Sequence, residues 1–497
     1  MPYATIFVVA LALRLLGLST QNIWYDEHWT LRVALAPLTQ LLDLLVAEEG
    51  SKPPIYFGLM HYWVKLGSSE FWLRLPSVLF GSLDAVVAAA LGRQLFGARG
   101  TALGWLVVLS PFHIYYSQEA RPFALWGLFT TTALLFHLRY CATPQRRFLL
   151  GYVTTTLLAC YTFTYALFFL PLFSALFIWL YRPALSRTQR VEMALGNAVV
   201  LLLYLPWLWR ILVAAVDGVG FIPLHRGPIY ASAAYAVFSL GLGISAGPSL
   251  EKLRSLGLSI FEHDALGSGV LVFGFLLVAT LVVAGAVVLW KAHRTAFYFA
   301  TTSLGMFLGT AALMNVLNPE VPLNPRYVLP AILPLMVLIL AGSGAAISGL
   351  QWQRWLGLAF LLTVSGSLAN HYLNPAYERD DLRAAAEFLE QLEPPPEKVL
   401  VCGSYLTEVF KHYYQDAIPV EGVSGPLRHE SARALPPLYD TLSGLGRFAL
   451  VYSRPDHGDR DRVLPDAFRS RYRLLHHQHW TGVDLYVFEV PGPALQR

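Results

Sequence analysis

Long apolar stretches separated by short polar segments recur through the first three-quarters of the chain. Each stretch is about 20 residues long, which is enough for an α-helix to cross a hydrocarbon core of ~30 Å. The pattern indicates an α-helical polytopic membrane protein. It predicts about eleven spans, over residues 3–18, 71–92, 100–116, 122–139, 148–162, 164–181, 194–212, 267–290, 295–315, 327–349 and 355–370.

The segments between the spans differ in charge on the two sides of the membrane. Short basic segments fall on one side in an alternating count, and basic residues concentrate in short cytoplasmic loops. This side is therefore predicted to be cytoplasmic, in the cell inner (plasma) membrane. Its basic residues are Arg93, Arg99, Arg139, Arg146, Arg147, Arg182, Arg187, Arg190, Lys291, Arg294 and Arg354. Residues 19–70, 213–266 and 317–326 are then expected to be extracytoplasmic, together with the tail after residue 370.

The tail has a different pattern, which predicts a soluble domain over 371–497 after a transmembrane domain over 1–370. Apolar residues recur at helical spacing over 378–392, and three prolines follow them. A second helical segment is expected over 405–414. Short apolar runs typical of strands lie at 398–402, 448–452 and 483–490. We therefore expect a small extracytoplasmic α/β domain of about 125 residues.

Composition supports a membrane protein and narrows its partners. Of the 497 residues, 55% are hydrophobic and only 14% are charged, whereas soluble domains carry about 25% charged residues. The net charge is only +4 and the basic residues lie in short loops, so no nucleic-acid partner is expected. Three scattered cysteines indicate neither a disulfide framework nor a zinc site. The tail also contains three histidines, His476, His477 and His479. Their spacing does not suit a zinc site, so they are interpreted as a surface cluster.

Two adjacent carboxylates, Asp26 and Glu27, follow the first predicted span closely. At the mouth of a membrane bundle the dielectric is low, so a charged carboxylate there needs a partner. Two structural interpretations stay open at this point. In the first, Asp26 caps the helix that follows it. In the second, the neighbouring aromatic residues Trp24, Tyr25 and Trp29 form an interfacial belt.

Further polar residues adjoin spans on the same predicted face. They are Lys52, His61, Gln118, Glu119, Arg121, Arg326 and Tyr327. Lys52 precedes a double proline, which fixes an extended entry to a helix. Each group also has a structural interpretation. Lys52 is then a snorkelling lysine, Glu119 and Arg121 form an ion pair, and Arg326 is an interfacial anchor.

Taken together, these groups combine carboxylates with cations at one membrane surface. Arginine and lysine hold a phosphodiester and stabilise the charge that develops as a phosphate leaves. A carboxylate accepts the proton of an incoming hydroxyl. This combination favours glycosyl transfer from a polyprenyl-phosphate sugar, with the donor phosphate near Lys52, Arg121 and Arg326.

The same residues resemble a known family. The segments WYDEHWTLRVA, SKPPIYFGLMHYWVKLGSSEFWLRLPSVLFGSL, PFHIYYSQEARPFAL and NPRYVLP are similar to the bacterial branch of the GT-C glycosyltransferases, relatives of the protein O-mannosyltransferases and of the lipid A aminoarabinose transferase. The resemblance implies a hexosyl- or pentosyltransferase that uses a polyprenyl-phosphate donor and modifies a lipid, glycan or protein acceptor of the cell envelope, such as lipopolysaccharide.

The resemblance also implies roles for individual residues. The acidic loop motif of the family falls on Asp26 and Glu27, with Asp26 as the catalytic aspartate, and its glutamate–arginine motif falls on Glu119 and Arg121. Relatives usually have histidine before the double proline, where this chain has Lys52. A permanent cation suits phosphate binding at that position but not proton transfer.

Stereochemistry can be argued from the residues alone. A retaining mechanism needs two carboxylates about 5 Å apart that face one centre. Neighbouring residues such as Asp26 and Glu27 point about 100° apart on a helix and to opposite faces of a strand. Direct displacement with inversion is therefore expected, with Asp26 as general base and Glu27 orienting the loop. The segment 213–266, which includes Phe221, Tyr230 and Tyr235, is expected to cover the site.

No cofactor is expected to be required, because cationic side chains already balance the phosphate, although two acids are able to hold Mg²⁺. The alternatives are a lipid-linked sugar flippase or other transporter and a non-catalytic scaffold. A transporter places its charges at the bilayer midplane, often within internal repeats, whereas the charged motifs here lie at the outer boundary. A scaffold has no need for them.

Overall fold

The computed structural model describes residues 2–47, 52–216, 229–317, 324–345, 350–423, 431–455, 459 and 462–491. The chain forms two compact units. The membrane unit comprises Met1–Leu18, Thr30–Ser249 and Gly257–Leu373. The C-terminal unit comprises Asn374–Arg497 together with two segments from earlier in the chain, Ser19–Trp29 and Leu250–Leu256. The helix α2 (Tyr25–Leu35) begins in the C-terminal unit and continues into the membrane unit.

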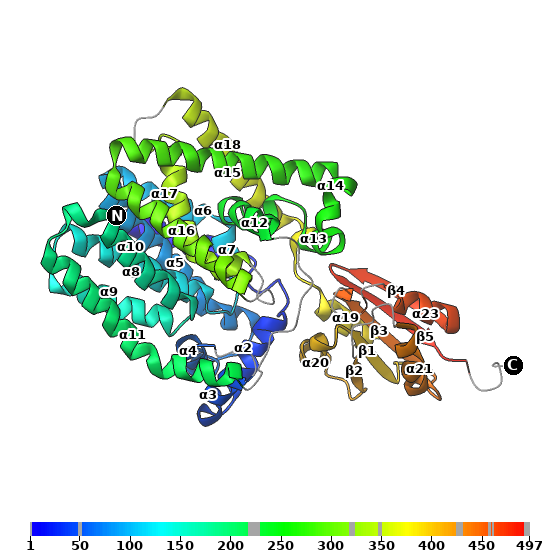
Figure 1. Ribbon diagram of the computed structural model, residues 1–497. Coiled ribbons are helices and arrows are strands. Elements are labelled where there is room, and N and C mark those ends of the chain that lie inside the picture. The colour runs from blue at the N-terminus through cyan, green and yellow to red at the C-terminus, as the bar shows by residue number, and fades with distance from the viewer. Residues whose placement is uncertain are drawn as a thin grey trace. The chain divides into compact units, whose positions relative to one another are not determined.

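The membrane unit is helical (Figure 1). Its first half contains α1 (Pro2–Leu15), α3 (Leu38–Ala47), α4 (Pro54–Trp63), α5 (Glu70–Phe96), α6 (Ala102–Leu109), α7 (Pro111–Ser117), α8 (Phe123–Ala142), α9 (Arg146–Cys160) and α10 (Tyr165–Tyr181). Its second half contains α11 (Arg187–Val216), α12 (Ile229–Leu242), α14 (Ile260–His263), α15 (Ala265–Ala292), α16 (Arg294–Leu317), α17 (Ile332–Gly342) and α18 (Gln351–Leu373). The 3₁₀ segment η5 (Pro325–Ala331) leads directly into α17.

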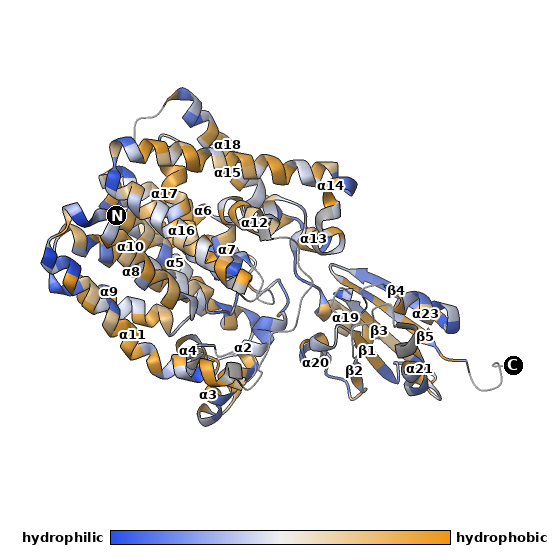
Figure 2. Ribbon diagram, viewed as in Figure 1, coloured by the Kyte–Doolittle hydropathy of each residue, from blue (hydrophilic) through white to orange (hydrophobic). Residues whose placement is uncertain are grey.

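Seven helical segments of the described residues are long and apolar enough to cross a membrane. They are Glu70–Leu109, Tyr165–Ala184, Arg187–Val213, Ala265–Ala292, Arg294–Leu313, Pro325–Gly342 and Gln351–Leu373. Figure 2 shows hydrophobic residues in orange along these helices. The prediction of a polytopic helical membrane protein is thus confirmed. The expected spans 3–18 and 148–162 correspond to α1 and α9, which are only 14 and 15 residues long. The expected span 122–139 corresponds to α8, which contains His137 and Arg139.

One predicted span is interrupted. The apolar stretch 100–116 was expected to form a single helix, but it consists of α6 and α7. Pro111 has no backbone N–H and its ring disfavours a helical residue before it, so Ser110 is extended with ψ 113°. The Ser110 side chain then accepts a hydrogen bond from His113 N and caps α7. In contrast, the predicted junction between spans at 161–164 matches the gap between α9 and α10.

Small residues bring α15 and α17 into close backbone contact. A Cβ atom added at Gly285 would lie 2.0 Å from the carbonyl oxygen of Leu338, and one at Gly342 would lie 2.1 Å from that of Leu281. Neither position has room for a side chain. This small-residue packing is typical of helix pairs in membranes, where close van der Waals contact drives association.

The C-terminal unit contains a five-stranded sheet of order β2-β1-β3-β5-β4 (Figure 1). Its strands are β1 (Lys398–Cys402), β2 (Val420–Gly422), β3 (Arg447–Ser453), β4 (Arg473–Trp480) and β5 (Val483–Glu489). The first three pair in parallel, and β5 pairs antiparallel with β3 and β4. The helices are α13 (Leu250–Leu256), α19 (Leu382–Glu390), α20 (Thr407–Tyr413), α21 (Ser431–Leu442) and α23 (Leu464–Arg471).

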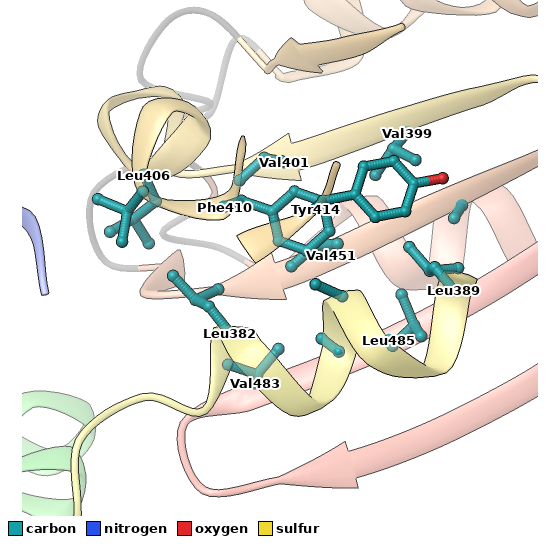
Figure 3. Packing of buried hydrophobic residues seen from close by; sticks show 14 of the residues in the cluster. Leu382, Leu389, Val399, Val401, Leu406, Phe410, Tyr414, Val451, Val483 and Leu485 are labelled. Carbon is teal, nitrogen blue, oxygen red and sulfur yellow. The ribbon is translucent and has the colours of Figure 1, made fainter. Parts of the chain in front are cut away.

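Both faces of this sheet carry hydrophobic clusters, because side chains alternate along each strand. From β1, Val399 and Val401 join α19 and α20 on one face (Figure 3). Leu400 and Cys402 belong to the cluster on the other face, which includes Phe468 of α23. The prediction of a small α/β domain is confirmed, and three of its strands lie where the apolar runs placed them. The three tail histidines lie exposed on β4, which was not predicted because its side chains are mostly polar.

Candidate functional site

The acidic segment, residues 22–28, is held by the C-terminal unit. The backbone N–H of Ile23 donates to the Tyr413 hydroxyl over 2.6 Å. The side-chain amide of Asn22 donates to Asp381 Oδ1 over 2.6 Å. The ring of Tyr25 packs edge-on against Tyr405, with centroids 5.1 Å apart. The segment is therefore anchored just before α2 and at its first residue, Tyr25.

Both predicted acids lie in the first turn of α2, where a helix favours negative charge. The backbone N–H groups of Glu27 and His28 donate to the Trp24 carbonyl, so Asp26 lies inside the helix and the interpretation of Asp26 as its cap is wrong. Asp26 is 8% exposed and Glu27 is fully buried. Glu27 forms an ion pair with Arg379, which is also buried.

Arg379 and a second arginine, Arg454, flank the indole ring of Trp24. The two guanidinium carbons lie 5.8 and 6.0 Å from the ring centroid. Arg454 forms an ion pair with Asp380. Burial disfavours its charged form, but the Asp380 carboxylate and the Tyr405 hydroxyl outweigh this effect, so the pKa of Arg454 lies above its ordinary value.

The sequence analysis did not identify either arginine. A signal was available in the dense charge run Glu378–Asp381, which follows the last span directly. A run of this kind is usually a solvated surface, and only the fold shows that it supports the acidic segment.

The basic positions of the membrane unit begin with Lys52, which is half-buried before α4. Pro53 is extended and Pro54 occupies the first turn of α4, as the double proline predicted. From this helix, the Tyr56 hydroxyl contacts Ser77 Oγ at 3.1 Å, and Ser77 in turn donates to the Arg121 carbonyl at 3.4 Å. The start of α4 is thereby tied to the glutamate–arginine turn.

The glutamate–arginine turn itself is buried. Glu119 is 1% exposed and Arg121 is 3% exposed. The Arg121 guanidinium donates to Thr30 Oγ1 of α2 over 3.4 Å. Gln118 donates to the carbonyls of Arg14 and Leu16, so its amide holds the turn against the end of α1.

Arg326 lies beside this turn. Asn324 caps η5 by accepting from Arg326 N over 3.2 Å. The guanidinium donates to the Tyr327 hydroxyl over 3.2 Å and lies 5.8 Å from the Phe123 ring centroid. The structure thus brings Arg326 and Tyr327 next to Phe123, which follows the glutamate–arginine turn in the chain.

Tyr327 and His61 have mainly packing contacts. The Tyr327 ring lies 5.8 Å from Tyr165 and 6.0 Å from Phe163, which makes an aromatic wall around Arg326. His61 is buried and its Nδ1 contacts the Ala34 carbonyl at 2.9 Å, so it links α4 to the end of α2. Among the described residues, no group of three histidine, cysteine or acidic side chains is arranged to hold a metal ion.

A buried ionic network inside the membrane unit was missed by the sequence analysis. Arg14 contacts His113 Nδ1 at 2.9 Å, and His113 Nε2 contacts Asp84 Oδ2 at 2.9 Å. Because a guanidinium only donates, Nδ1 accepts and Nε2 carries the proton donated to Asp84. All three residues are at most 5% exposed. The available signal was a charged residue inside each of the apolar stretches 3–18 and 71–92, Arg14 and Asp84.

A small cavity adjoins this network. It is lined by Asp84 and His113 of the network and by Gly127, Thr131 and Leu329. Its size suits about one water molecule. Within the described part of the chain Asp84 Oδ1 has no hydrogen-bond partner, so a water placed here would complete the network.

Neither a protein family nor a curated protein matches the sequence. Among solved structures, ArnT from Cupriavidus metallidurans bound to undecaprenyl phosphate is similar over 98% of both chains, with a TM-score of 0.58 and 15% identity. The structure of the same protein in the apo state has a TM-score of 0.59 and 14% identity, and the match covers 98% of this chain and 97% of that chain.

A different transferase also has a similar fold. The oligosaccharyltransferase of Archaeoglobus fulgidus, in complex with Zn and sulfate, matches 90% of this chain and 68% of its own, with a TM-score of 0.51 and 12% identity. These likenesses confirm the fold that the motifs implied. The protein therefore has the GT-C fold, as a multi-pass helical membrane protein with a small C-terminal α/β domain.

Proposed function

We propose that this protein is an integral membrane glycosyltransferase that moves a sugar from a polyprenyl-phosphate donor to an acceptor hydroxyl on the extracytoplasmic face. The fold supports this proposal, since ArnT has been crystallised with undecaprenyl phosphate. The observation that carries it is the contact of Arg326 with Phe123, the first residue of α8, which follows the buried glutamate–arginine turn, 119–121, in the chain. Arginine guanidinium groups bind phosphate oxygens through charge-assisted, often bidentate hydrogen bonds.

The donor phosphate is assigned to Lys52, Arg121 and Arg326. Their positive charge balances the phosphodiester in the ground state and the phosphate that leaves during the reaction. The aromatic wall around Arg326 orients its planar guanidinium. No cofactor is required in this proposal, because the cations already provide the compensating charge.

The chemical step is a single displacement. The Asp26 carboxylate accepts the proton of the acceptor hydroxyl, the hydroxyl oxygen forms a bond to the anomeric carbon, and the bond from that carbon to the phosphate oxygen breaks. The electron pair of the broken bond leaves with polyprenyl phosphate, and the anomeric configuration inverts. The burial of Glu27 and its pairing with Arg379 support the assignment of the base to Asp26.

We also assign to segment 213–266 the role of covering the site. Phe221 lies outside the described residues. Tyr235 lies on α12, and α12 packs against both α7 and η5. These contacts support a cover over the turn that carries Glu119 and Arg121.

The test is a release assay with the purified protein in detergent and synthetic polyprenyl-phosphate sugars. Release of polyprenyl phosphate together with a glycosylated acceptor, identified by mass spectrometry, is the expected result. An inverted anomeric configuration in the product would support direct displacement. Failure with every donor and candidate acceptor would overturn the proposal and favour the transporter, because detergent removes the two compartments that transport needs.

Arg326→Gln is expected to weaken the binding of undecaprenyl phosphate by about 10- to 100-fold, because one charge-assisted hydrogen bond to phosphate contributes roughly 1.5–3 kcal/mol. Arg326→Lys keeps the charge but loses the planar contact with the rings, so an intermediate affinity is expected. The measurement is the Kd of each purified variant in the same detergent.

Arg294→Gln is the control for this series. Arg294 also lies over an aromatic ring, with its guanidinium carbon 3.4 Å from the Trp290 centroid, but it lies in the basic connection between α15 and α16. The Kd of the Arg294→Gln variant for undecaprenyl phosphate should equal that of the wild type. Equal affinities for Arg326→Gln and the wild type would remove Arg326 from the phosphate site.

A further inference from the structure

The ion pair between Glu27 and Arg379 joins two segments separated by 352 positions in the chain. Both belong to the C-terminal unit. The Glu27 side chain is completely buried and that of Arg379 is 7% exposed. A buried carboxylate that loses its cation is left uncompensated, which is strongly unfavourable. Glu27 and Arg379 therefore hold each other in place.

The neighbours of Glu27 are held by the same unit. His28 packs edge-on against His412, with ring centroids 5.9 Å apart. Together with the contacts of Asn22, Ile23 and Tyr25, anchors lie on both sides of Asp26. The Glu27 ion pair lies in the same helical turn as Asp26. It differs from the anchors at Tyr25 and His28 because it joins two opposite charges in a buried environment.

We propose that Arg379 is a positioning residue: by pairing with Glu27 it fixes the first turn of α2 and with it the carboxylate of Asp26. This inference rests on the proposed function, in which Asp26 is the general base. It assigns to the C-terminal domain the task of holding the base. A misplacement of about 1 Å in a reacting group lowers rate by about 10²-fold, so the position of this turn determines the rate.

The first test compares kinetics of the full-length enzyme and Arg379→Gln. We expect kcat to fall about 100-fold while the Kd for undecaprenyl phosphate changes less than twofold, because the pair supports the base and not the phosphate site. Arg379→Lys, which retains the charge, should recover a large part of kcat. Glu27→Gln should cause a similar loss, and the double variant should lose no more than either single variant.

The matched control is Lys398→Gln. Lys398 is 13% exposed and pairs with Glu421 at 2.9 Å between β1 and β2 of the same unit. Removing this pair perturbs the domain without touching the acidic segment. Wild-type kcat is expected in the control. An equal loss of kcat in Lys398→Gln and Arg379→Gln would overturn the proposal, because any weakening of the domain would then suffice.

A second readout does not depend on activity. Hydrogen–deuterium exchange of the full-length protein in detergent is expected to rise in peptides covering residues 20–30 for Arg379→Gln and to stay unchanged there for Lys398→Gln. Unchanged exchange in Arg379→Gln would overturn the proposal. If exchange rises but the wild type transfers no sugar, the proposed function fails while the structural anchoring stands. If Asp26→Asn is inactive but Arg379→Gln has wild-type kcat, the positioning role alone fails.

Discussion

Asp26→Asn is expected to lower the rate of sugar transfer by about three orders of magnitude, within the 10²–10⁴-fold contribution of a positioned general base. The amide has nearly the same size and keeps α2 intact, but it does not accept the hydroxyl proton. Donor binding should change little, because the phosphate is assigned to Lys52, Arg121 and Arg326. The measurements are polyprenyl phosphate release under saturating donor and the Kd for undecaprenyl phosphate.

Asp43→Asn provides the control for this substitution. Asp43 lies in the same segment between the first two spans, but its side chain is 79% exposed and faces Arg210 at 4.0 Å. We expect wild-type transfer for Asp43→Asn. Normal transfer by Asp26→Asn, combined with an inactive Glu119→Gln, would move the base from α2 to the glutamate–arginine turn.

Arg14→Met is expected to destabilise the protein by about 3–5 kcal/mol, the usual cost of removing one partner from a buried ionic network. The Arg14 guanidinium donates to the carbonyls of Ala10 and Val107 and contacts both Ser117 and His113. Methionine fills much of the volume but leaves the Asp84 charge uncompensated. The free energy of unfolding in detergent, or the Tm measured in the same detergent, gives the effect.

Two further variants separate the charge from simple loss of packing. Arg147→Met removes an exposed arginine that lies over the Phe148 ring, and its effect should stay within about 0.5 kcal/mol. The double variant Arg14→Met/Asp84→Asn removes both charges, so it should be more stable than Arg14→Met alone. A wild-type Tm for Arg14→Met would show that the network contributes nothing to stability.

Local signals predicted those parts of the fold that depend on neighbouring residues. The double proline specified the start of α4, and the apolar runs of the tail specified β1, β3 and β5. The break at Pro111 was missed because average hydropathy over 100–116 outweighed the effect of one proline. The averages likewise concealed Arg14 and Asp84, since a single charge barely changes the hydropathy of a 20-residue stretch.

The candidate site likewise contains residues that local signals predicted and contacts that they did not. Asp26, Arg121 and Arg326 were predicted as site residues because each adjoins a span, and these assignments stay predictions. The partner of Glu27 was not, because nothing local to either residue specifies a pairing across 352 positions. The contact of Arg326 with Phe123 likewise depends on how η5 meets the start of α8, which the tertiary packing determines.

The pairing of Glu27 with Arg379 has a consequence for biosynthesis. At a translation rate of about 5–20 residues per second, Arg379 is made roughly 20–70 s after Glu27. Throughout that interval the ribosome has already delivered the acidic segment, but its counter-ion does not yet exist. A chain that terminates prematurely before residue 379 inserts its early spans and never completes this pair. The buried Glu27 carboxylate thus acquires this counter-ion only after synthesis has passed the last membrane helix, α18.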